Sequence, residues 1–437
     1  MKIFSTFLTL FLVFSLGAQS FDKQKMDSLF KVVEFNSKGM GGIAIHRNGM
    51  PVYQNNIGFA DISSNIQAHP HTKYRIGSIS KTFTAAMILQ LVEEGKLSLD
   101  TRLSEFYPQI QNAQNISIED LLRHQSGLFN FTDDEAYKEY MEQPRTKKEL
   151  LQIFKKQDPV FAPGEKNEYS NTNYVLLSFV LEDVEKQSYA EVLKKRILKP
   201  LGLKHTGYGG KIDSERSEAY SYIKKKDWEP ASETDMSIPI GAGALISTPS
   251  DLNLFFTALF KGNIVKPENL EKMKTLKNGY GMGLFSYPFN DKSFYGHTGG
   301  IDGFSAMSTY YPEEDLAMTY ISNGTDLSPN DIAIGALSIY WGLDYAIPSF
   351  DSLDLSTEEL KKYEGTYGSE TFPLKVKIFV EDGTLMGQAT GQPAFPLEAY
   401  DEDKFQFIRA GLQLEFSPEE DKMILLQGGN TYQLSRK

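Results

Sequence analysis

The chain has 437 residues, of which 41% are hydrophobic, and a formal net charge of −12. That length is enough for a sizeable core and more than one domain. The acidic balance argues against nucleic acid and anionic membranes as partners. The chain has no cysteine, which excludes disulfides, thiolate metal sites and a cysteine nucleophile. No histidine spacing indicates a metal site, and we expect no cofactor.

The first twenty residues have the pattern of a secretory signal peptide. Met1-Lys2 gives a minimal positive start, residues 3–16 form an apolar run that is short for a membrane span, and small residues follow. We expect cleavage after Ala18 or Ser20, with an uncleaved anchor as the alternative. No second apolar span follows, so the mature protein is expected to be secreted or periplasmic, without a stable membrane anchor.

The next segments predict a helix and a pair of strands, followed by a buried helix. Residues 21–35 look helical, and residues 41–58 alternate as strands around an Asn48-Gly49 turn. Residues 82–94 are apolar on nearly all sides, which is typical of a buried helix, and Gly95 ends the pattern. Ser117 with Asp120 and Ser188 with Glu191 form capping boxes that predict two more helices before residue 202.

Ser78 and Lys81 stand at the start of the buried helix as a Ser-Ile-Ser-Lys motif. Free backbone N–H groups at a helix N-terminus favour a developing negative charge at Ser78. Lys81, three residues later, lies on the same helix face. A buried lysine beside a serine can lose its proton near neutral pH and serve as a base. The bare Ser-x-x-Lys pattern recurs elsewhere in the chain, so this context is what singles out Ser78.

Two further motifs follow in order, Tyr169-Ser170-Asn171 and His297-Thr298-Gly299. A nucleophile with a lysine one turn away, a Tyr/Asn pair and a short polar strand with glycine describe an acyl-transfer site without a histidine–aspartate couple. The chain has no Gly-x-Ser-x-Gly elbow, so a conventional Ser–His–Asp hydrolase is a poor alternative.

The remainder of the sequence predicts strands, a helix, a linker and a second domain. Strands return over residues 294–321, and residues 331–340 form a helix. These patterns alone support a mixed α/β class, in a domain that we place at residues 21–345. Residues 346–358 read as a linker. Residues 359–437 alternate in short runs around turns, which predicts a small all-β barrel or sandwich.

The ordered motifs resemble those of the penicillin-recognising serine enzymes, which comprise D,D-peptidases and penicillin-binding proteins, serine β-lactamases, and related esterases and D-aminopeptidases. Their Tyr-x-Asn branch is the most similar. The resemblance also covers Leu121–Leu128 (LLRHQSGL), Phe161–Gly164 (FAPG), residues 241–252 (GAGALISTPSDL) and Tyr280–Leu284 (YGMGL). It implies an antiparallel sheet flanked by helices, built from both ends of the domain, with an inserted helical domain.

The resemblance also implies roles for the site residues. Ser78 attacks a carbonyl and forms an acyl-enzyme, with Lys81 and Tyr169 as candidate bases. Asn171 orients Lys81, and the backbone N–H groups of Ser78 and Gly300 form an oxyanion hole. The remaining predicted substrate-binding residues are His297, Thr298 and Gly299, on a strand that lines the cleft.

His297 departs from the lysine that most serine β-lactamases of the family have at this position. A histidine is only partly protonated near neutral pH, so this departure argues against an efficient β-lactamase and leaves a peptidase or an esterase open. The resemblance implies a D,D-carboxypeptidase-like or β-lactamase-related hydrolase of a peptidoglycan-type D-alanyl peptide, a β-lactam or an ester. A small-ester hydrolase, a D-aminopeptidase and a non-hydrolytic penicillin-binding sensor are the alternatives.

Overall fold

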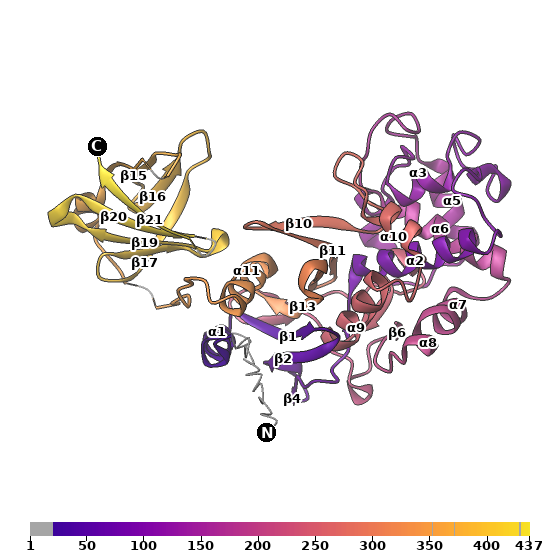
Figure 1. Ribbon diagram of the computed structural model, residues 1–437, viewed down its shortest axis with the longest axis horizontal. Helices are drawn as coiled ribbons and strands as arrows, with labels where there is room; N and C mark the ends of the chain where they lie inside the picture. The colour runs from indigo at the N-terminus through magenta and orange to yellow at the C-terminus, as the bar shows by residue number, and fades with distance from the viewer. Residues whose placement is uncertain (1–20, 352, 371, 428–429) are drawn as a thin grey trace, which may run out of the picture.

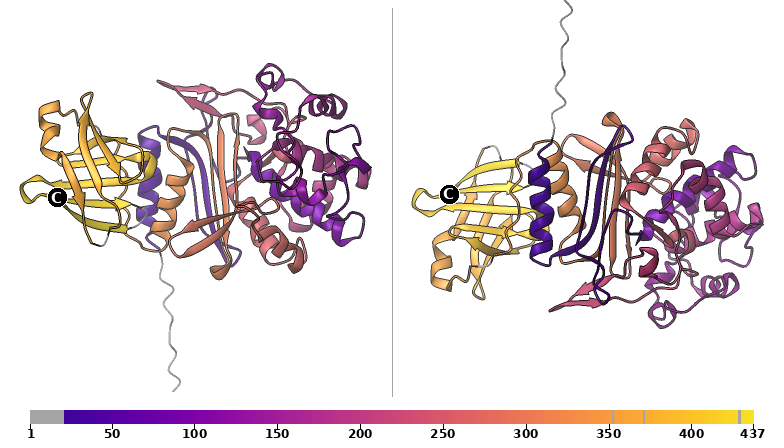
Figure 2. Two further views of the ribbon diagram at one scale, coloured as in Figure 1. Left: turned by 90° about the horizontal axis from the view of Figure 1, so that it is seen from above. Right: turned by 90° about the horizontal axis from the view of Figure 1, so that it is seen from below.

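The computed structural model describes residues 21–351, 353–370, 372–427 and 430–437, so the predicted signal peptide lies outside the described residues. The chain forms a central sheet with a helix-rich region on one face and two helices on the other, and a separate barrel beyond those two helices (Figures 1 and 2). The predicted mixed α/β class with an additional β domain is confirmed. Within the described part of the chain, no helix is both long and apolar enough to cross a membrane.

The central sheet has six antiparallel strands in the order β10-β11-β12-β13-β1-β2. β1 pairs along β13 from Gly39 with Thr325 to Arg47 with Leu316, so the two ends of the catalytic domain meet in the middle of the sheet. This confirms the predicted topology. The strands are β1 (Gly39–Arg47), β2 (Met50–Ile57), β10 (Phe285–Phe289), β11 (Lys292–Ile301), β12 (Phe304–Tyr311) and β13 (Leu316–Thr325).

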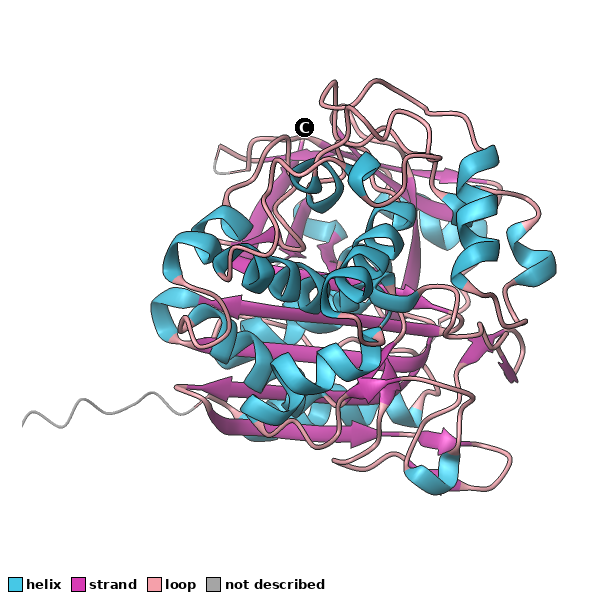
Figure 3. Ribbon diagram, turned by 90° about the vertical axis from the view of Figure 1, so that its right-hand side faces the viewer, coloured by secondary structure: helices cyan, strands magenta, loops and turns pink. Residues whose placement is uncertain are grey.

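Alternate residues of the central strands face two different cores. Ile43 and Ile45 of β1 face the core shared with α1 (Lys23–Phe35) and α11 (Pro329–Tyr340). Ala306 of β12 and Ile321 of β13 face the larger core of the helix-rich region. Figure 3 shows helices of that region in front of the sheet. Both faces of the central strands are thus covered by a hydrophobic core. The candidate active site lies where the sheet meets the helix-rich region.

The helix-rich region lies between β2 and β10 in the chain. α2 (Ser80–Glu93) is buried on all sides over its first ten residues, as its apolar sequence predicts, and Gly95 with φ +69° ends it. Both predicted capping boxes form. The other helices are α3 (Ile118–Leu122), α4 (Tyr137–Tyr140), α5 (Lys147–Lys156), α6 (Asn171–Glu185), α7 (Tyr189–Leu193), α8 (Lys199–Leu201), α9 (Pro249–Phe260) and α10 (Pro267–Lys274).

Three small sheets join the loops around this region. β5 pairs with β9, and β9 pairs with β6, which ties the strand before Ser78 to the segment before α9. The short strands are β3 (Phe59–Asp61), β4 (Ile66–Gln67), β5 (Tyr74–Arg75), β6 (Gly207–Tyr208), β7 (Tyr222–Lys224), β8 (Trp228–Pro230) and β9 (Leu245–Ser247).

The C-terminal domain is a closed barrel of the strands β14 to β21, in which β14 pairs with β21 to complete the ring. The sequence left a barrel or a sandwich open, and the structure shows the barrel. α12 (Thr357–Leu360) precedes it, beginning within the predicted linker. The strands are β14 (Gly365–Gly368), β15 (Val376–Glu381), β16 (Thr384–Ala389), β17 (Phe395–Asp401), β18 (Lys404–Phe407), β19 (Leu412–Ser417), β20 (Lys422–Gln427) and β21 (Asn430–Arg436).

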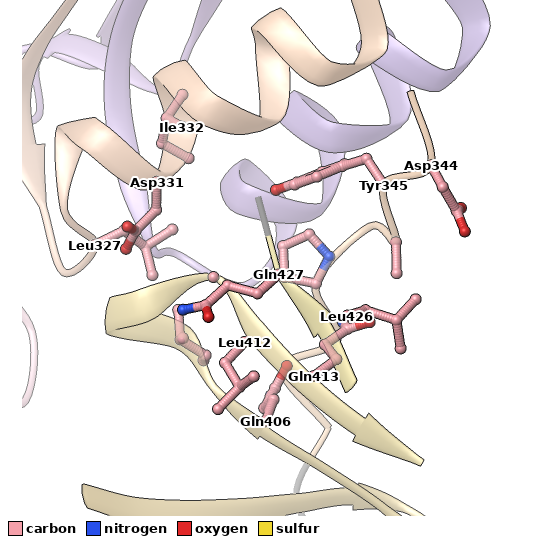
Figure 4. Close-up of a pocket in the computed structure, with 14 residues that line it drawn as sticks. Leu327, Asp331, Ile332, Asp344, Tyr345, Gln406, Leu412, Gln413, Leu426 and Gln427 are labelled. Atoms are coloured by element: carbon pink, nitrogen blue, oxygen red, sulfur yellow. The ribbon is translucent and has the colours of Figure 1, made fainter. Parts of the chain in front are cut away.

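The barrel packs against the α11 side of the catalytic domain around a cavity of about 50 Å³ (Figure 4). Leu412, Leu426 and Gln427 line it from the barrel, and Asp331 and Tyr345 line it from the catalytic domain. One carboxylate oxygen of Asp331 is buried without a hydrogen-bond partner among the described residues. Asp331 lies in the first turn of α11, whose dipole favours a carboxylate, yet burial outweighs this and raises the pKa of Asp331 to about 7.

This buried carboxyl predicts a pH-dependent gain in stability for Asp331→Asn. Because the folded state keeps its proton up to a higher pH than the unfolded state, the wild type loses stability between about pH 4 and pH 7. We expect the variant to be more stable by about 1–2 kcal/mol at pH 8, after allowance for solvent screening, and nearly unchanged at pH 4.5. Urea denaturation at both pH values measures this, with the exposed Asp354→Asn as the control. Equal stabilisation at both pH values would contradict it.

Candidate active site

Ser78 lies in a single 3₁₀ turn, Gly77–Ile79, that leads directly into α2. The turn requires Gly77, because its φ is +50° and a Cβ there would lie 2.8 Å from the backbone N of Gly300. A Cβ on Gly299 would lie 2.0 Å from the carbonyl oxygen of Ile76. The end of β11 therefore packs directly against the turn that contains Ser78, with no space for a side chain at Gly77 or Gly299.

Arg75, two residues before Gly77, fixes this turn to the hairpin after β11. Its Nη1 donates to Asp302 Oδ2 at 2.7 Å and to the carbonyl oxygen of Thr234 at 2.8 Å. Both members of the ion pair are buried, with side-chain exposures of 2% for Arg75 and 0% for Asp302. Thr234 donates its backbone N–H and its hydroxyl to the other Asp302 oxygen. Arg75 is therefore a structural ion-pair partner within the chain.

Lys81 is fully buried directly behind Ser78, with its Nζ 2.9 Å from Ser78 Oγ. The Nζ also donates to Asn171 Oδ1 and to the carbonyl oxygen of Ala242, each at 2.7 Å. Burial holds the pKa of the Lys81 amine well below its usual range. A neutral amine has two N–H groups for those two oxygens, and its lone pair then faces the serine hydroxyl. This arrangement can accept a proton from Ser78.

Tyr169 contacts the same serine from the other side, with its hydroxyl 2.7 Å from Ser78 Oγ. Burial raises the pKa of Tyr169, so its hydroxyl keeps its proton at neutral pH. The ring stacks on His124 at a centroid distance of 4.5 Å, and His124 Nδ1 accepts the backbone N–H of Ser170. His124 thus packs against the tyrosine and supports it.

Asn171 starts α6 and connects several parts of the site. Its backbone N–H donates to Asn130 Oδ1 at 2.9 Å, and its Nδ2 donates to Thr132 Oγ1 at 3.1 Å. Its Oδ1 then faces Lys81. Because an amide oxygen accepts and an amide nitrogen donates, these contacts fix the orientation of the Asn171 side chain. The predicted orienting role toward Lys81 matches this geometry.

The segment from His297 to Gly300 lies beside Ser78 at the end of β11. β10 pairs with β11 only as far as Gly296 in the described chain, so the later residues have no strand partner on that side. His297 Nδ1 lies next to the carbonyl oxygen of Thr298 and therefore carries the proton, because a carbonyl only accepts. Burial, with a smaller effect from Lys81, lowers the pKa of His297 to about 3. The expected partial protonation of His297 is wrong, because the sequence did not reveal its burial.

Two cavities lie on either side of Ser78 and share Ser78 and Gly300. One, of about 310 Å³, we call the loop cavity. The other, of about 290 Å³, we call the aromatic cavity. Besides the two shared residues, the loop cavity is lined by residues that include Phe131, Tyr137, Met141, Asn171, Pro239 and Ile301. The aromatic cavity is lined by Tyr169, Phe285, Tyr287, His297, Thr298 and Gly299.

The structure brings the predicted site residues close together, and sequence reasoning missed four supporting residues. Ala242 contributes a backbone carbonyl, and Gly77 contributes a backbone conformation, neither of which has a side-chain signal. Phe285 and Tyr287 line the aromatic cavity, and the strand pattern around His297 was the available signal for them. Over the described residues, no group of three or more histidines and carboxylates is arranged to hold a metal ion.

Several known proteins are similar to this chain in sequence and in structure. The family model described as Beta-lactamase matches residues 30–337. Penicillin-binding protein 4* of Bacillus subtilis is 25% identical, and the match covers 93% of this chain and 97% of that protein. The octameric penicillin-binding protein homologue from Pyrococcus abyssi has a TM-score of 0.68 and 28% identity, over 94% of this chain and 99% of that one.

A solved amidase is also similar to the catalytic domain. The D-amino acid amidase from Ochrobactrum anthropi, in a structure complexed with L-phenylalanine amide, has a TM-score of 0.60 and 26% identity. That likeness covers 69% of this chain and 92% of the amidase. Since the family model matches well over half of the chain, this protein belongs to the beta-lactamase family of serine hydrolases.

Proposed function

We propose that this protein hydrolyses amide or ester bonds of small D-aminoacyl compounds through an acyl-enzyme on Ser78. The observation that carries the proposal is the position of Ser78 Oγ within hydrogen-bond distance of both Lys81 Nζ and Tyr169 OH. A neutral lysine beside the serine supplies a base, and a protonated tyrosine supplies an acid. The similar amidase and penicillin-binding proteins support amide and β-lactam chemistry as the reaction class.

The proposed reaction has two steps that use the same groups. Ser78 Oγ bonds to the carbonyl carbon and gives its proton to Lys81, and the oxyanion takes hydrogen bonds from the backbone N–H groups of Ser78 and Gly300. The bond to the leaving nitrogen or oxygen then breaks, and Tyr169 protonates that atom. In the second step water attacks the ester carbonyl carbon and gives one proton to the Tyr169 oxygen. The bond to Ser78 Oγ then breaks, and Lys81 returns its proton to that oxygen, so all three groups regain their starting forms. Asn171 holds Lys81 in place throughout.

The predicted signal peptide supports action outside the cytoplasmic membrane, in the periplasm or the medium. The substrates then come from that compartment, and peptidoglycan-type D-alanyl compounds are one class of candidate there. N-terminal sequencing of the exported protein would test this, because a start at Gln19 or Phe21 is expected.

Ser78→Ala is expected to abolish both covalent labelling and turnover. The experiment follows the intact mass of the wild type and the variant over time with the p-nitrophenyl ester of N-acetyl-D-alanine. An acyl adduct or rapid p-nitrophenol release in the wild type, absent in Ser78→Ala, supports the proposal. Ser28→Ala is a matched control, since Ser28 also has a lysine three residues later but is exposed on α1. Full activity of Ser78→Ala would contradict the proposal.

The same mass measurement with a penicillin separates the alternatives. A stable adduct indicates a penicillin-binding peptidase or a non-hydrolytic sensor, and turnover of the ester decides between those two. Hydrolysed penicillin without an adduct indicates a β-lactamase. Intact penicillin with ester turnover indicates an esterase or a D-aminopeptidase.

A further inference from the structure

The aromatic cavity holds the leaving group in the proposed reaction. The acid that protonates the leaving atom must be on the leaving-group side of Ser78. Tyr169 lines the aromatic cavity, whereas Asn171 lines the loop cavity. The acyl part of the substrate therefore occupies the loop cavity, and the part that is released occupies the aromatic cavity.

The aromatic cavity contains no group that carries a positive charge. Three of its lining residues are aromatic rings, Tyr169, Phe285 and Tyr287, and no lysine or arginine is among them. Lys81 lines neither cavity, because Ser78, Asn171 and Ala242 surround its amine. Those rings would replace the water around a charged group without pairing with its charge.

His297 does not supply the missing charge. Its side chain is 2% exposed, and Phe285 packs edge-on against its ring at a centroid distance of 5.0 Å. Its Nδ1 proton is used by the Thr298 carbonyl, and its Nε2 is buried without a partner among the described residues. A second proton on Nε2 would be a buried, unpaired charge, which such an apolar contact disfavours.

The lysines that precede Tyr169 and Phe285 in the chain are paired with carboxylates. Lys166 pairs with Glu168 at 2.7 Å, and Lys277 pairs with Glu119 at 2.8 Å. Neither lysine lines the aromatic cavity. A carboxylate placed in this cavity would therefore lose its hydration without gaining a cation.

We propose that the enzyme acts on substrates whose leaving side is uncharged, namely amides and esters of D-amino acids and carboxyl-capped peptides, rather than on peptides that release an amino acid with a free carboxylate. This inference rests on the proposed function and narrows it. It separates the protein from the carboxypeptidase that the sequence motifs predict. In the reaction, the carbonyl–nitrogen or carbonyl–oxygen bond breaks as the Ser78 ester forms, and the released amine or alcohol takes the proton.

A matched substrate pair tests the inference. N-acetyl-D-alanyl-D-alanine and its C-terminal amide share the acyl group and differ in the charge that enters the aromatic cavity. We expect kcat/KM for the capped peptide to exceed that for the free acid by about 100-fold, because the unpaired carboxylate is desolvated. Equal rates, or faster cleavage of the free acid, would overturn the inference.

The Phe285→Arg variant tests the inference in the opposite direction, because it adds a positive charge to the aromatic cavity. A guanidinium in the aromatic cavity pairs with a carboxylate, so we expect the preference for the capped peptide to fall at least about tenfold. Ser286→Arg is the matched control, because alternation along β10 directs its side chain to the other face of the strand. An unchanged preference in Phe285→Arg, or the same change in both variants, would overturn the inference.

Acylation of Ser78 by an ester distinguishes a failure of the leaving-group inference from a failure of the proposed function. The p-nitrophenyl ester of N-acetyl-D-alanine reports acylation whichever peptide is preferred. If the ester acylates Ser78 and the two peptides react equally, the leaving-group inference alone is wrong. If neither the ester nor either peptide acylates Ser78, the proposed function is wrong and the inference fails with it.

Discussion

Lys81→Met is expected to lower kcat/KM by about 10²- to 10⁴-fold, which is the effect typical of losing a general base. Methionine has a similar length and no proton-accepting nitrogen, so Ser78 loses the group 2.9 Å from its Oγ that takes its proton. The variant leaves Asn171 Oδ1 and the Ala242 carbonyl without a donor, at about 1–3 kcal/mol each. Removal of a buried amine offsets part of that cost, so the variant is expected to remain folded.

The pH profile makes this prediction specific to the base. In the wild type, kcat/KM is expected to rise with pH as Lys81 loses its proton, at a pH below the usual range for lysine. The residual activity of Lys81→Met should lack this rise. Lys148→Met, at an exposed position of α5, is the control and should keep the wild-type profile. A Lys81→Met variant with the wild-type rate and profile would show that Tyr169 acts as the base.

Arg75→Met is expected to lower the free energy of unfolding by about 3–5 kcal/mol, because it leaves the Asp302 carboxylate buried without its cation. Asp302 is fully buried and keeps only the two Thr234 donors when Arg75 is gone. The same change releases the turn before Ser78 from the hairpin after β11, so kcat/KM should fall even in the fraction that remains folded. Urea denaturation, with activity at a temperature below the transition, measures both effects.

Two further variants test whether the buried charge is the cause. Arg75→Met/Asp302→Asn removes the unpaired carboxylate and should recover at least half of the lost stability. Lys225→Met breaks the exposed ion pair with Glu229, whose side chains are 67% and 53% exposed, and should change stability by less than about 1 kcal/mol. A double variant no more stable than Arg75→Met would mean that packing of the arginine, and not its charge, is responsible.

Local patterns predicted the elements of this fold well. The apolar run after Ser78 has no polar side, and α2 is indeed buried all round. Alternation in residues 374–380 and 412–416 predicted strands, which form as β15 and β19. The closure of the barrel was beyond this reasoning, because it depends on pairing between β14 and β21, at opposite ends of the domain. Strand periodicity specifies which face is buried and not which strand is the neighbour.

The chemistry of the site could be predicted only in part, again because some of it depends on contacts between distant segments. Ser78 and Lys81 are one helical turn apart, so their proximity follows from the sequence. The protonation of His297 does not, because it depends on Phe285 covering the ring from another strand. Ala242 was missed because any residue can offer a backbone carbonyl. Side-chain identity indicates possible chemistry, whereas burial and backbone contacts determine which form of each group is present.

The pairing of β1 with β13 has a consequence for how the protein is made. A growing chain that has reached Asn171 already contains Ser78, Lys81 and Tyr169, but it lacks Gly300 and the strands that hold it against the serine turn. Such long-range contacts form late and slowly. The complete cluster around Ser78 therefore exists only after nearly the whole domain has been synthesised. An incomplete chain, whether still on the ribosome or truncated, therefore contains the reactive side chains without the strand that completes the site.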